Sequence, residues 1–180
     1  MKRVGDLERK YVLDVLDSQF RSSQGAKYMT KFENSFKKKF KSKFAISHVN
    51  GTATMHSVLE ASGIGIGDEV IVPPLTMSAT SLAVLHANAT PVFADVDINT
   101  FNIDSKSIEK NITKKTKAII TVALYGLSPD MDPIMSLAKK YNLLVIEDNA
   151  QAFLSYYKGR LAGTFGDAAS FSFQSSKHLS

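Results

Sequence analysis

Two stretches near the end of the sequence place residues that could do chemistry directly after apolar segments. Residues 143–146 are four apolar residues in a row, and Glu147 and Asp148 follow at once. Such a run predicts a buried parallel strand with carboxylates at its carboxyl end, the edge of an open α/β sheet where ligands bind. Residues 168–173 predict a second strand, and Lys177 follows it behind two serines. A lysine in that position can present its amine to a pocket.

A third stretch, near residue 50, has the pattern of a phosphate-binding turn. A short apolar segment, residues 45–49, predicts a strand, and Gly51 and Thr52 then open a helix. Glycine allows a ligand to approach the backbone closely, and the free N–H groups of a first helical turn point outward at the positive end of the helix dipole. An ordinary helix cap at Asn50 or Thr52 explains the same residues. Both interpretations remain open at this point.

The elements that must position these residues alternate along the chain. Apolar spacing and turn signals predict helices over residues 6–20, through Phe32, Phe36 and Phe40, and over 51–61, 76–88, 104–112 and 130–141. Further strands are predicted over 70–72, 91–95 and 117–124, and a tight hairpin over 156–160. This alternation after Asp68 indicates a mostly parallel sheet with helices on both faces and right-handed crossovers.

Composition excludes several classes of protein. The chain has 180 residues, of which 44% are hydrophobic, enough for one well-buried domain. It has no cysteine, which excludes disulfides, zinc-thiolate sites and a thiol nucleophile, and no metal-binding residues are predicted. No apolar run approaches the ~20 residues of a membrane span, and the first residues lack a hydrophobic signal core. We expect a soluble, cytoplasmic protein that binds no membrane.

The formal net charge of +5 comes from the first part of the chain. Residues 1–44 hold twelve Lys or Arg against five Asp or Glu. The segment 36–44 interleaves lysines with phenylalanines, a composition found in nucleic-acid-binding patches. The spacing of Phe32, Phe36 and Phe40 by four residues favours instead an amphipathic helix with solvated lysines, and no nucleic acid is expected as a partner.

Several motifs in this order resemble the fold-type-I enzymes that use pyridoxal 5′-phosphate (PLP), and more narrowly the DegT/DnrJ family of sugar aminotransferases. The family's E-D-x-A-Q is similar to residues 147–151, and its G-D-x-x-x-F-S-F-x-x-x-K to residues 166–177. Upstream, GDEVIVP, TMSAT and PVFADVD match further family segments, so the resemblance runs from about residue 25 to the end. It implies a three-layer αβα sandwich with a mostly parallel, mixed sheet.

The resemblance also implies roles for individual residues. Lys177 would supply the amine that binds PLP covalently and would move protons at the substrate carbon. Asp148 would pair with the pyridinium nitrogen, and Gln151 would contact the side of the ring that carries the phenolic oxygen. Asp148 and Lys177 are the predicted catalytic residues.

The remaining cofactor-binding residues would hold the phosphate and cover the ring. Thr52 and Ala53 belong to a G-T-A segment that holds the PLP phosphate in the family, and Ser172 would donate a hydrogen bond to the same group. Met77 stands where relatives carry an aromatic residue that stacks on the ring. A thioether can also pack on an aromatic face, so Met77 is retained as a cofactor-binding residue.

By resemblance, the reaction is transfer of an amino group from glutamate to a nucleotide-linked keto-deoxysugar, in the biosynthesis of polysaccharides or glycosylated products. Some relatives carry histidine in place of Lys177 and act as sugar dehydratases, so the lysine favours transamination. Two alternatives remain: another PLP reaction on the same scaffold, and a non-catalytic binding or regulatory fragment.

Family members are about twice as long as this chain and are homodimers. We therefore expect a helical segment, residues 1–44, and an incomplete PLP-binding large domain, residues 45–180. The rest of that domain and a small C-terminal domain would be absent.

Overall fold

The computed structural model describes residues 4–18 and 26–178, which form two compact units that divide after Ser47. Each unit is described by itself. Within the described ranges, no helix is both long enough and apolar enough to cross a membrane.

The first unit consists of two helices. Helix α1 spans Asp6–Asp17 and α2 spans Lys27–Phe40, which confirms both predicted helices, although residues 19 and 20 of the first prediction lie outside the described residues. On α2 the rings of Phe36 and Phe40 stack with centroids 4.4 Å apart. Lysines 37 to 39 are exposed, as expected of an amphipathic helix.

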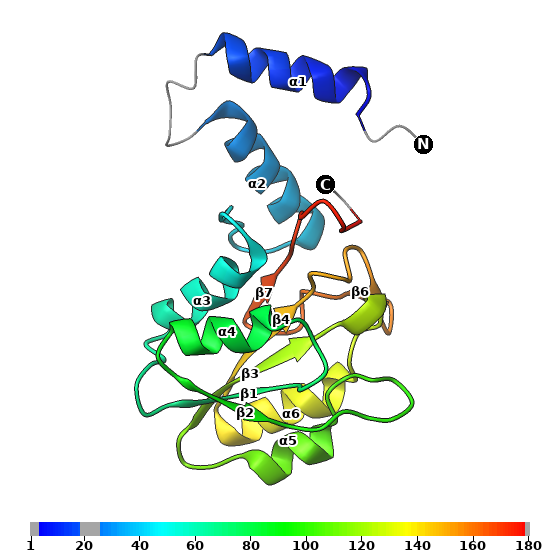
Figure 1. Cartoon of the computed structure of the whole chain (residues 1–180). Coiled ribbons are helices and arrows are strands. Elements are labelled where there is room, and N and C mark those ends of the chain that lie inside the picture. Colours follow the sequence, from blue (N-terminus) through cyan, green and yellow to red (C-terminus); the bar gives the residue numbers. More distant parts are fainter. Residues whose placement is uncertain (1–3, 19–25, 179–180) are drawn as a thin grey trace. The chain divides into compact units, whose positions relative to one another are not determined.

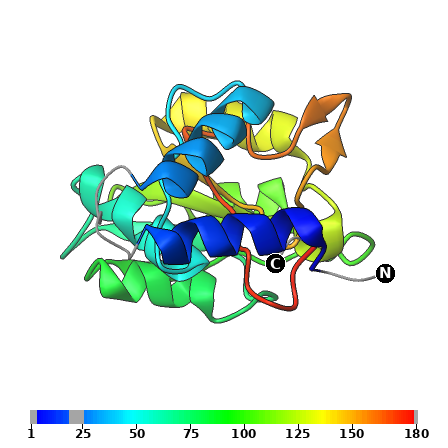
Figure 2. The same ribbon diagram turned by 90° about the horizontal axis from the view of Figure 1, so that it is seen from above.

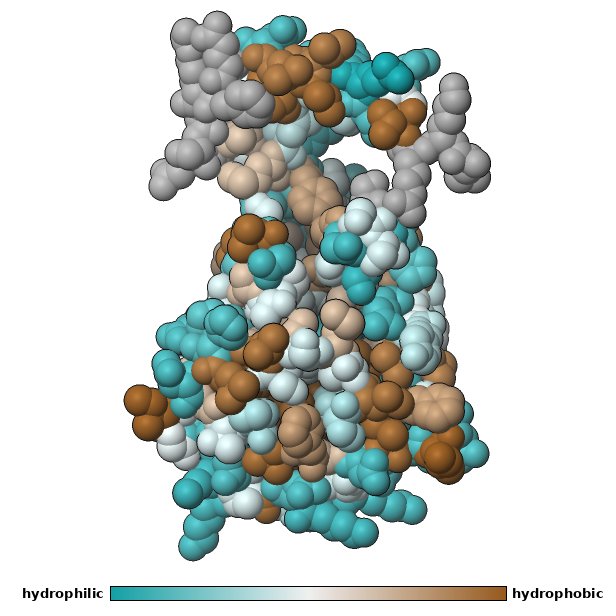
Figure 3. All heavy atoms as spheres, viewed as in Figure 1, coloured by the Kyte–Doolittle hydropathy of each residue, from teal (hydrophilic) through white to brown (hydrophobic). Residues whose placement is uncertain are grey.

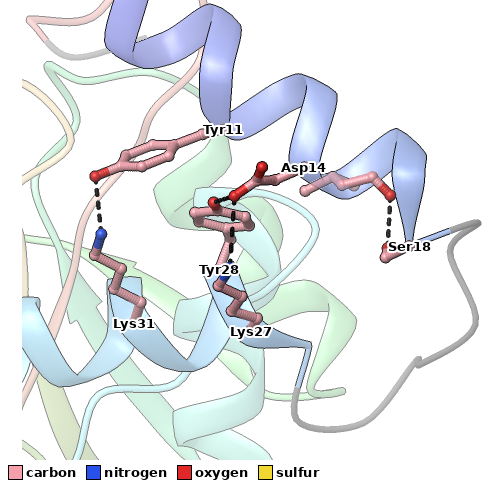
Figure 4. Close-up of polar contacts among 7 residues, drawn as sticks. Tyr11, Asp14, Ser18, Lys27, Tyr28 and Lys31 are labelled. Atoms are coloured by element: carbon pink, nitrogen blue, oxygen red, sulfur yellow. Dashed lines mark hydrogen bonds and ion pairs between the residues drawn. The ribbon is translucent and has the colours of Figure 1, made fainter.

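Polar contacts join α1 to α2 (Figure 4). Tyr28 donates its hydroxyl hydrogen to Asp14, Lys27 lies 3.5 Å from the same carboxylate, and Lys31 donates to the Tyr11 hydroxyl. The hydrogen bond to Asp14 raises the pKa of Tyr28 to about 12. Apolar side chains of α1 remain exposed on the surface of this unit (Figure 3): Leu7, Val12, Leu13 and Leu16.

The predicted strand over residues 45–49 is wrong. These residues form no strand, and Ile46 and Val49 are 71% and 88% exposed. The backbone N–H and the hydroxyl of Ser47 donate to the carboxylate of Glu33 instead of entering a sheet ladder. A short apolar run forms a strand only where a neighbouring strand can satisfy its backbone groups.

The second unit is built on a five-stranded sheet with the order β2-β1-β3-β4-β7. Its strands are β1 (Glu69–Val72), β2 (Thr90–Phe93), β3 (Thr116–Val122), β4 (Leu144–Asp148) and β7 (Ala168–Ser170). The pairings recorded between these strands are all parallel, which confirms the predicted α/β class. The expected antiparallel component of a mixed sheet is not seen among the described residues of this sheet.

Helices cover both faces of this sheet (Figure 1). On one face, α3 (Gly51–Ala61) and α4 (Ala79–His86) pack Met55, Leu59 and Val84 against Val70, Val72, Ala118, Ile120 and Ile146. On the other, α5 (Ser105–Asn111) and α6 (Met131–Tyr141) pack Ile108 and Ile134 against Ile71, Ile119 and Val145. Successive residues of a strand thus enter opposite cores, and the three-layer sandwich is confirmed.

Element ends differ from the predictions by a few residues. Helix α4 begins three residues later than expected, and Asn88, with φ of 59°, follows its end in the left-handed conformation. The predicted strand over 117–124 ends at Val122, and a short 3-10 helix, η1 (Leu124–Gly126), follows it. The predicted hairpin is confirmed: β5 (Tyr156–Tyr157) and β6 (Arg160–Leu161) pair antiparallel. This hairpin projects beside α6 (Figure 2), where Lys158 forms an ion pair with Asp132.

Candidate active site

Asp148 ends strand β4 in the interior of the sheet, between β3 and β7. Its side chain points to the face covered by α3 and α4 and is 5% exposed. One carboxylate oxygen accepts the backbone N–H of Ala150 at 3.1 Å, and the other accepts the hydroxyl of Thr80 at 3.0 Å. Burial raises the pKa of Asp148, although these two hydrogen bonds and the positive charge of Lys177 oppose the rise. A buried carboxylate of this kind is a ready partner for a cation.

Lys177 belongs to the segment that follows β7, the strand that pairs with β4. It follows β7, where its backbone N–H closes a turn on the carbonyl of Gln174 at 2.8 Å, and it is half-buried. Its positive charge opposes the rise of the Asp148 pKa that burial causes, and it is the smallest of the effects on that carboxyl. The two predicted catalytic residues belong to neighbouring parts of the sheet, because Asp148 ends β4 and Lys177 follows β7, which pairs with β4.

Thr52 and Ala53 lie in the first turn of α3. Asn50 caps this helix, and its side-chain oxygen accepts the backbone N–H of Ala53 at 2.8 Å. The cap interpretation is therefore correct for Asn50, and the Ala53 N–H is already used within the protein. The N–H groups of Gly51 and Thr52 have no acceptor inside the helix because of their position at its start. These two amides are the donors of this turn that suit an anion.

Ser172, which follows β7, lies next to the first turn of α3. A Cβ placed on Gly51 would lie 3.4 Å from the Cβ of Ser172 and 3.8 Å from the hydroxyl oxygen of Ser170. The Ser170 hydroxyl donates to the carbonyl of Gly51 and also bonds with the hydroxyl of Thr54. These contacts join the start of α3 to the end of β7, so that Gly51, the residue before Thr52, lies against Ser172.

Gln151 and Met77 are placed less directly. The side-chain oxygen of Gln151 accepts the backbone N–H of Tyr125 at 2.9 Å. Tyr125 has a positive φ of 52°, and its side chain is 82% exposed. Met77 is 61% exposed and precedes α4, where its carbonyl accepts the N–H of Thr80. Met77 is thus fixed through its backbone to the residue that binds Asp148.

Thr80 is a site residue that sequence reasoning missed. Thr80 is the last residue of the TMSAT motif, from which only Met77 was selected, and it is fully buried. The bond from Thr80 to Asp148 joins residues 68 apart in sequence, and only the tertiary fold shows it.

A parallel α/β domain with a buried carboxylate and a helix N-terminus at its carboxyl edge agrees with the fold-type-I class that the resemblance implies. The sequence matches the DegT/DnrJ/EryC1/StrS aminotransferase family over residues 2–180, and the chain belongs to this family. The resemblance noted from its motifs is therefore confirmed.

Individual relatives agree with this assignment. The chain is 47% identical over 175 residues to GDP-perosamine synthase of Caulobacter vibrioides, covering 97% of this chain and 47% of that protein. It matches the structure of an aminotransferase from Psychrobacter cryohalolentis with a TM-score of 0.94 and 43% identity, covering 98% and 45% of the two chains. NtdA from Bacillus subtilis, solved with bound cofactor PMP, matches with a TM-score of 0.86 and 32% identity, covering 98% and 40%. The chain spans about half the length of the curated relatives it matches.

Proposed function

We propose that the full-length protein is a PLP-dependent aminotransferase that transfers an amino group from glutamate to a nucleotide-linked keto-deoxysugar in polysaccharide or glycosylated-product biosynthesis. The observation that carries this is the buried Asp148 carboxylate at the carboxyl edge of the sheet, with Lys177 in the segment that follows the neighbouring strand β7. The similarity to GDP-perosamine synthase supports a nucleotide sugar as the acceptor. It does not favour the alternatives of a dehydratase or a non-catalytic fragment.

The residues at this edge fit PLP. Asp148 is buried and has two neutral hydrogen-bond donors, so a cationic pyridinium would supply a charge partner for it. Lys177 offers an amine, and the α3 amides of Gly51 and Thr52 with the Ser172 hydroxyl offer donors to a phosphate. Ala53 would contribute through its position in the turn, since its N–H is bonded to Asn50. Met77 would cover the ring, and Gln151 would act at the side of the phenolic oxygen.

Each residue then has a defined task. Bound PLP supplies the electron-withdrawing ring that makes amino-group transfer possible. The negative charge of Asp148 would favour the protonated pyridine nitrogen, and Thr80 orients that carboxylate by donating a hydrogen bond to it. Lys177 would hold the cofactor through its amine, and the same amine could move a proton to or from the substrate carbon. In this proposal residues 45–180 form the PLP-binding part, residues 1–44 a separate helical segment, and the protein is a cytoplasmic homodimer.

The test is a half-reaction without any sugar. Full-length protein loaded with PLP and given L-glutamate is expected to release close to one equivalent of 2-oxoglutarate per active site and then stop. Addition of a GDP-linked keto-deoxysugar is expected to restart the reaction and yield the amino sugar. A protein that binds PLP but leaves glutamate unchanged would contradict the proposed transamination. Omission of PLP serves as the control.

Thr80→Val is expected to shift the pH profile of PLP affinity to higher pH. Valine has nearly the shape of threonine but donates no hydrogen bond, so the pKa of Asp148 rises further above its ordinary value. Because the carboxyl must lose its proton to hold a pyridinium, PLP affinity then rises only at higher pH. Loss of the buried donor also costs about 1–3 kcal/mol of stability.

The measurement is PLP affinity across a pH series, with Thr80→Ser as the matched control. Serine keeps the hydroxyl and is expected to keep the wild-type profile. Superposition of the Thr80→Val and wild-type profiles would show that Thr80 does not act on Asp148.

A further inference from the structure

Glu147 is a second buried carboxylate, next to Asp148 in sequence but on the opposite face of the sheet. Strand β4 alternates its side chains, so Val145 and Glu147 share the face covered by α5 and α6, whereas Ile146 and Asp148 share the other. Glu147 is 3% exposed. The proposed chemistry does not use it, although it is the first residue of the E-D-x-A-Q motif.

The Glu147 carboxylate accepts three backbone N–H groups from one loop, residues 163–166. One oxygen accepts Gly163 at 2.6 Å, and the other accepts Phe165 at 2.6 Å and Gly166 at 2.7 Å. Hydrogen bonds to an ionised acceptor are short and strong. A single side chain thus satisfies most of the backbone donors of this loop, and we name Glu147 with residues 163–166 the Glu147 clamp.

The clamp has no space for side chains at its two glycines. Gly163 has φ of +88°, and a Cβ there would lie 2.5 Å from the ring of Phe171. A Cβ on Gly166 would lie 2.6 Å from the backbone oxygen of Val145. Since real Cβ atoms do not approach this closely, the loop backbone lies directly against β4 and Phe171. The glycine of the G-D motif is therefore required by close packing.

The clamp leads directly into the segment that carries the candidate phosphate and lysine residues. Asp167 follows it and bonds twice to Val145, accepting its N–H and donating to its carbonyl, each at 2.9 Å. Strand β7 then pairs with β4 so that Ser170 lies opposite Asp148. The ring of Phe171 packs against Gly163. Ser172 and Lys177 follow Phe171 in the sequence. The position of the clamp thus sets where these two residues lie relative to Asp148.

We infer that Glu147 is a positioning residue for the PLP site: by holding loop 163–166 it aligns Ser172 and Lys177 with Asp148 across the sheet. This inference rests on the proposed function. The requirement is for a carboxylate, because both side-chain oxygens must accept. Glutamine offers one accepting oxygen and one donating NH₂, so either Gly163 or the pair Phe165 and Gly166 would face another donor.

Glu147→Gln in the full-length protein is expected to speed amide hydrogen exchange in loop 163–166. It is also expected to lower the maximal single-turnover rate constant of the glutamate half-reaction, written kcat here, roughly tenfold to a hundredfold. A shift of about 1 Å in a reacting group can lower a rate by this much. KM for glutamate should change by less than about threefold, since the residue touches no substrate. Gly163→Ala disturbs the clamp from the loop side and is expected to give the same split between kcat and KM while Glu147 remains intact.

The matched control is Ile108→Ala on α5. This residue is fully buried in the same core but outside the loop, so the variant loses stability with little change in kcat. Wild-type kcat in Glu147→Gln, or an equal loss of kcat in Ile108→Ala at a similar melting temperature, would overturn the inference. Wild-type protein that releases no 2-oxoglutarate would instead overturn the proposed function, and with it the catalytic consequence of the clamp.

Discussion

Lys177→Ala in the full-length protein is expected to lower the rate of the glutamate half-reaction by about a thousandfold or more, equivalent to at least ~4 kcal/mol of transition-state stabilisation. In the proposed mechanism, the variant would lose both the covalent attachment of PLP and the amine that moves the proton, and proton transfer alone is worth about 10²–10⁴ in rate. PLP is expected to remain bound through the phosphate donors but to leave on dialysis.

The measurement that accompanies it is borohydride reduction of the PLP-loaded wild-type protein, followed by peptide mapping. Label is expected on the peptide that contains Lys177. Lys139→Ala is the control, because this exposed lysine lies at the end of α6 and away from β7. Label confined to other lysines, or near-normal turnover in Lys177→Ala, would remove Lys177 from the proposed role.

The layers of this fold could be predicted from local pattern because buried parallel strands are apolar on both faces. Residues 143–146 and 117–122 show this directly, and both form central strands of the sheet. The same signal failed at residues 45–49, where the apolar residues have no neighbouring strand and Ser47 bonds to Glu33. An apolar run indicates that a segment can be buried. Whether it forms a buried strand depends on the presence of neighbouring strands that can pair with it.

The candidate site divides in a similar way. Asp148 and Lys177 could be selected because each follows a strand, and strand ends of a parallel sheet meet at one edge. The partners that adjust them could not, since Thr80 reaches Asp148 from a helix 68 residues away and Glu147 holds a loop 16 to 19 residues later. Both residues lie inside motifs that the sequence shows, but a motif does not say which groups its side chains contact. Register and packing supply the missing information.

Asp148→Asn is expected to lower the single-turnover rate of the glutamate half-reaction about a hundredfold or more, equivalent to at least ~2.7 kcal/mol of transition-state stabilisation. The variant is expected to retain most of its PLP. The change preserves shape: the amide oxygen can accept the Ala150 N–H, and the NH₂ can donate to the Thr80 hydroxyl, which is able to turn and accept. The negative charge disappears, and with it the group that keeps the pyridine nitrogen protonated. That charge matters most when negative charge develops at the substrate carbon, so the larger loss belongs in kcat, and PLP affinity falls by a smaller factor.

The same substitution is expected to have the opposite effect on the cofactor-free protein. Burial raises the pKa of Asp148 above 3.8 in the folded state, so the folded protein holds this proton more tightly than the unfolded chain does. The free energy of unfolding therefore falls as pH rises from 3.8 through the folded pKa. Asparagine does not ionise and avoids this loss, so at neutral pH the cofactor-free variant should melt at the wild-type temperature or above it. With PLP bound, wild type should regain the advantage, because the pyridinium pairs with the buried carboxylate. A variant that is equally destabilised with and without PLP, and that turns over glutamate at the wild-type rate, would show that Asp148 serves only the fold.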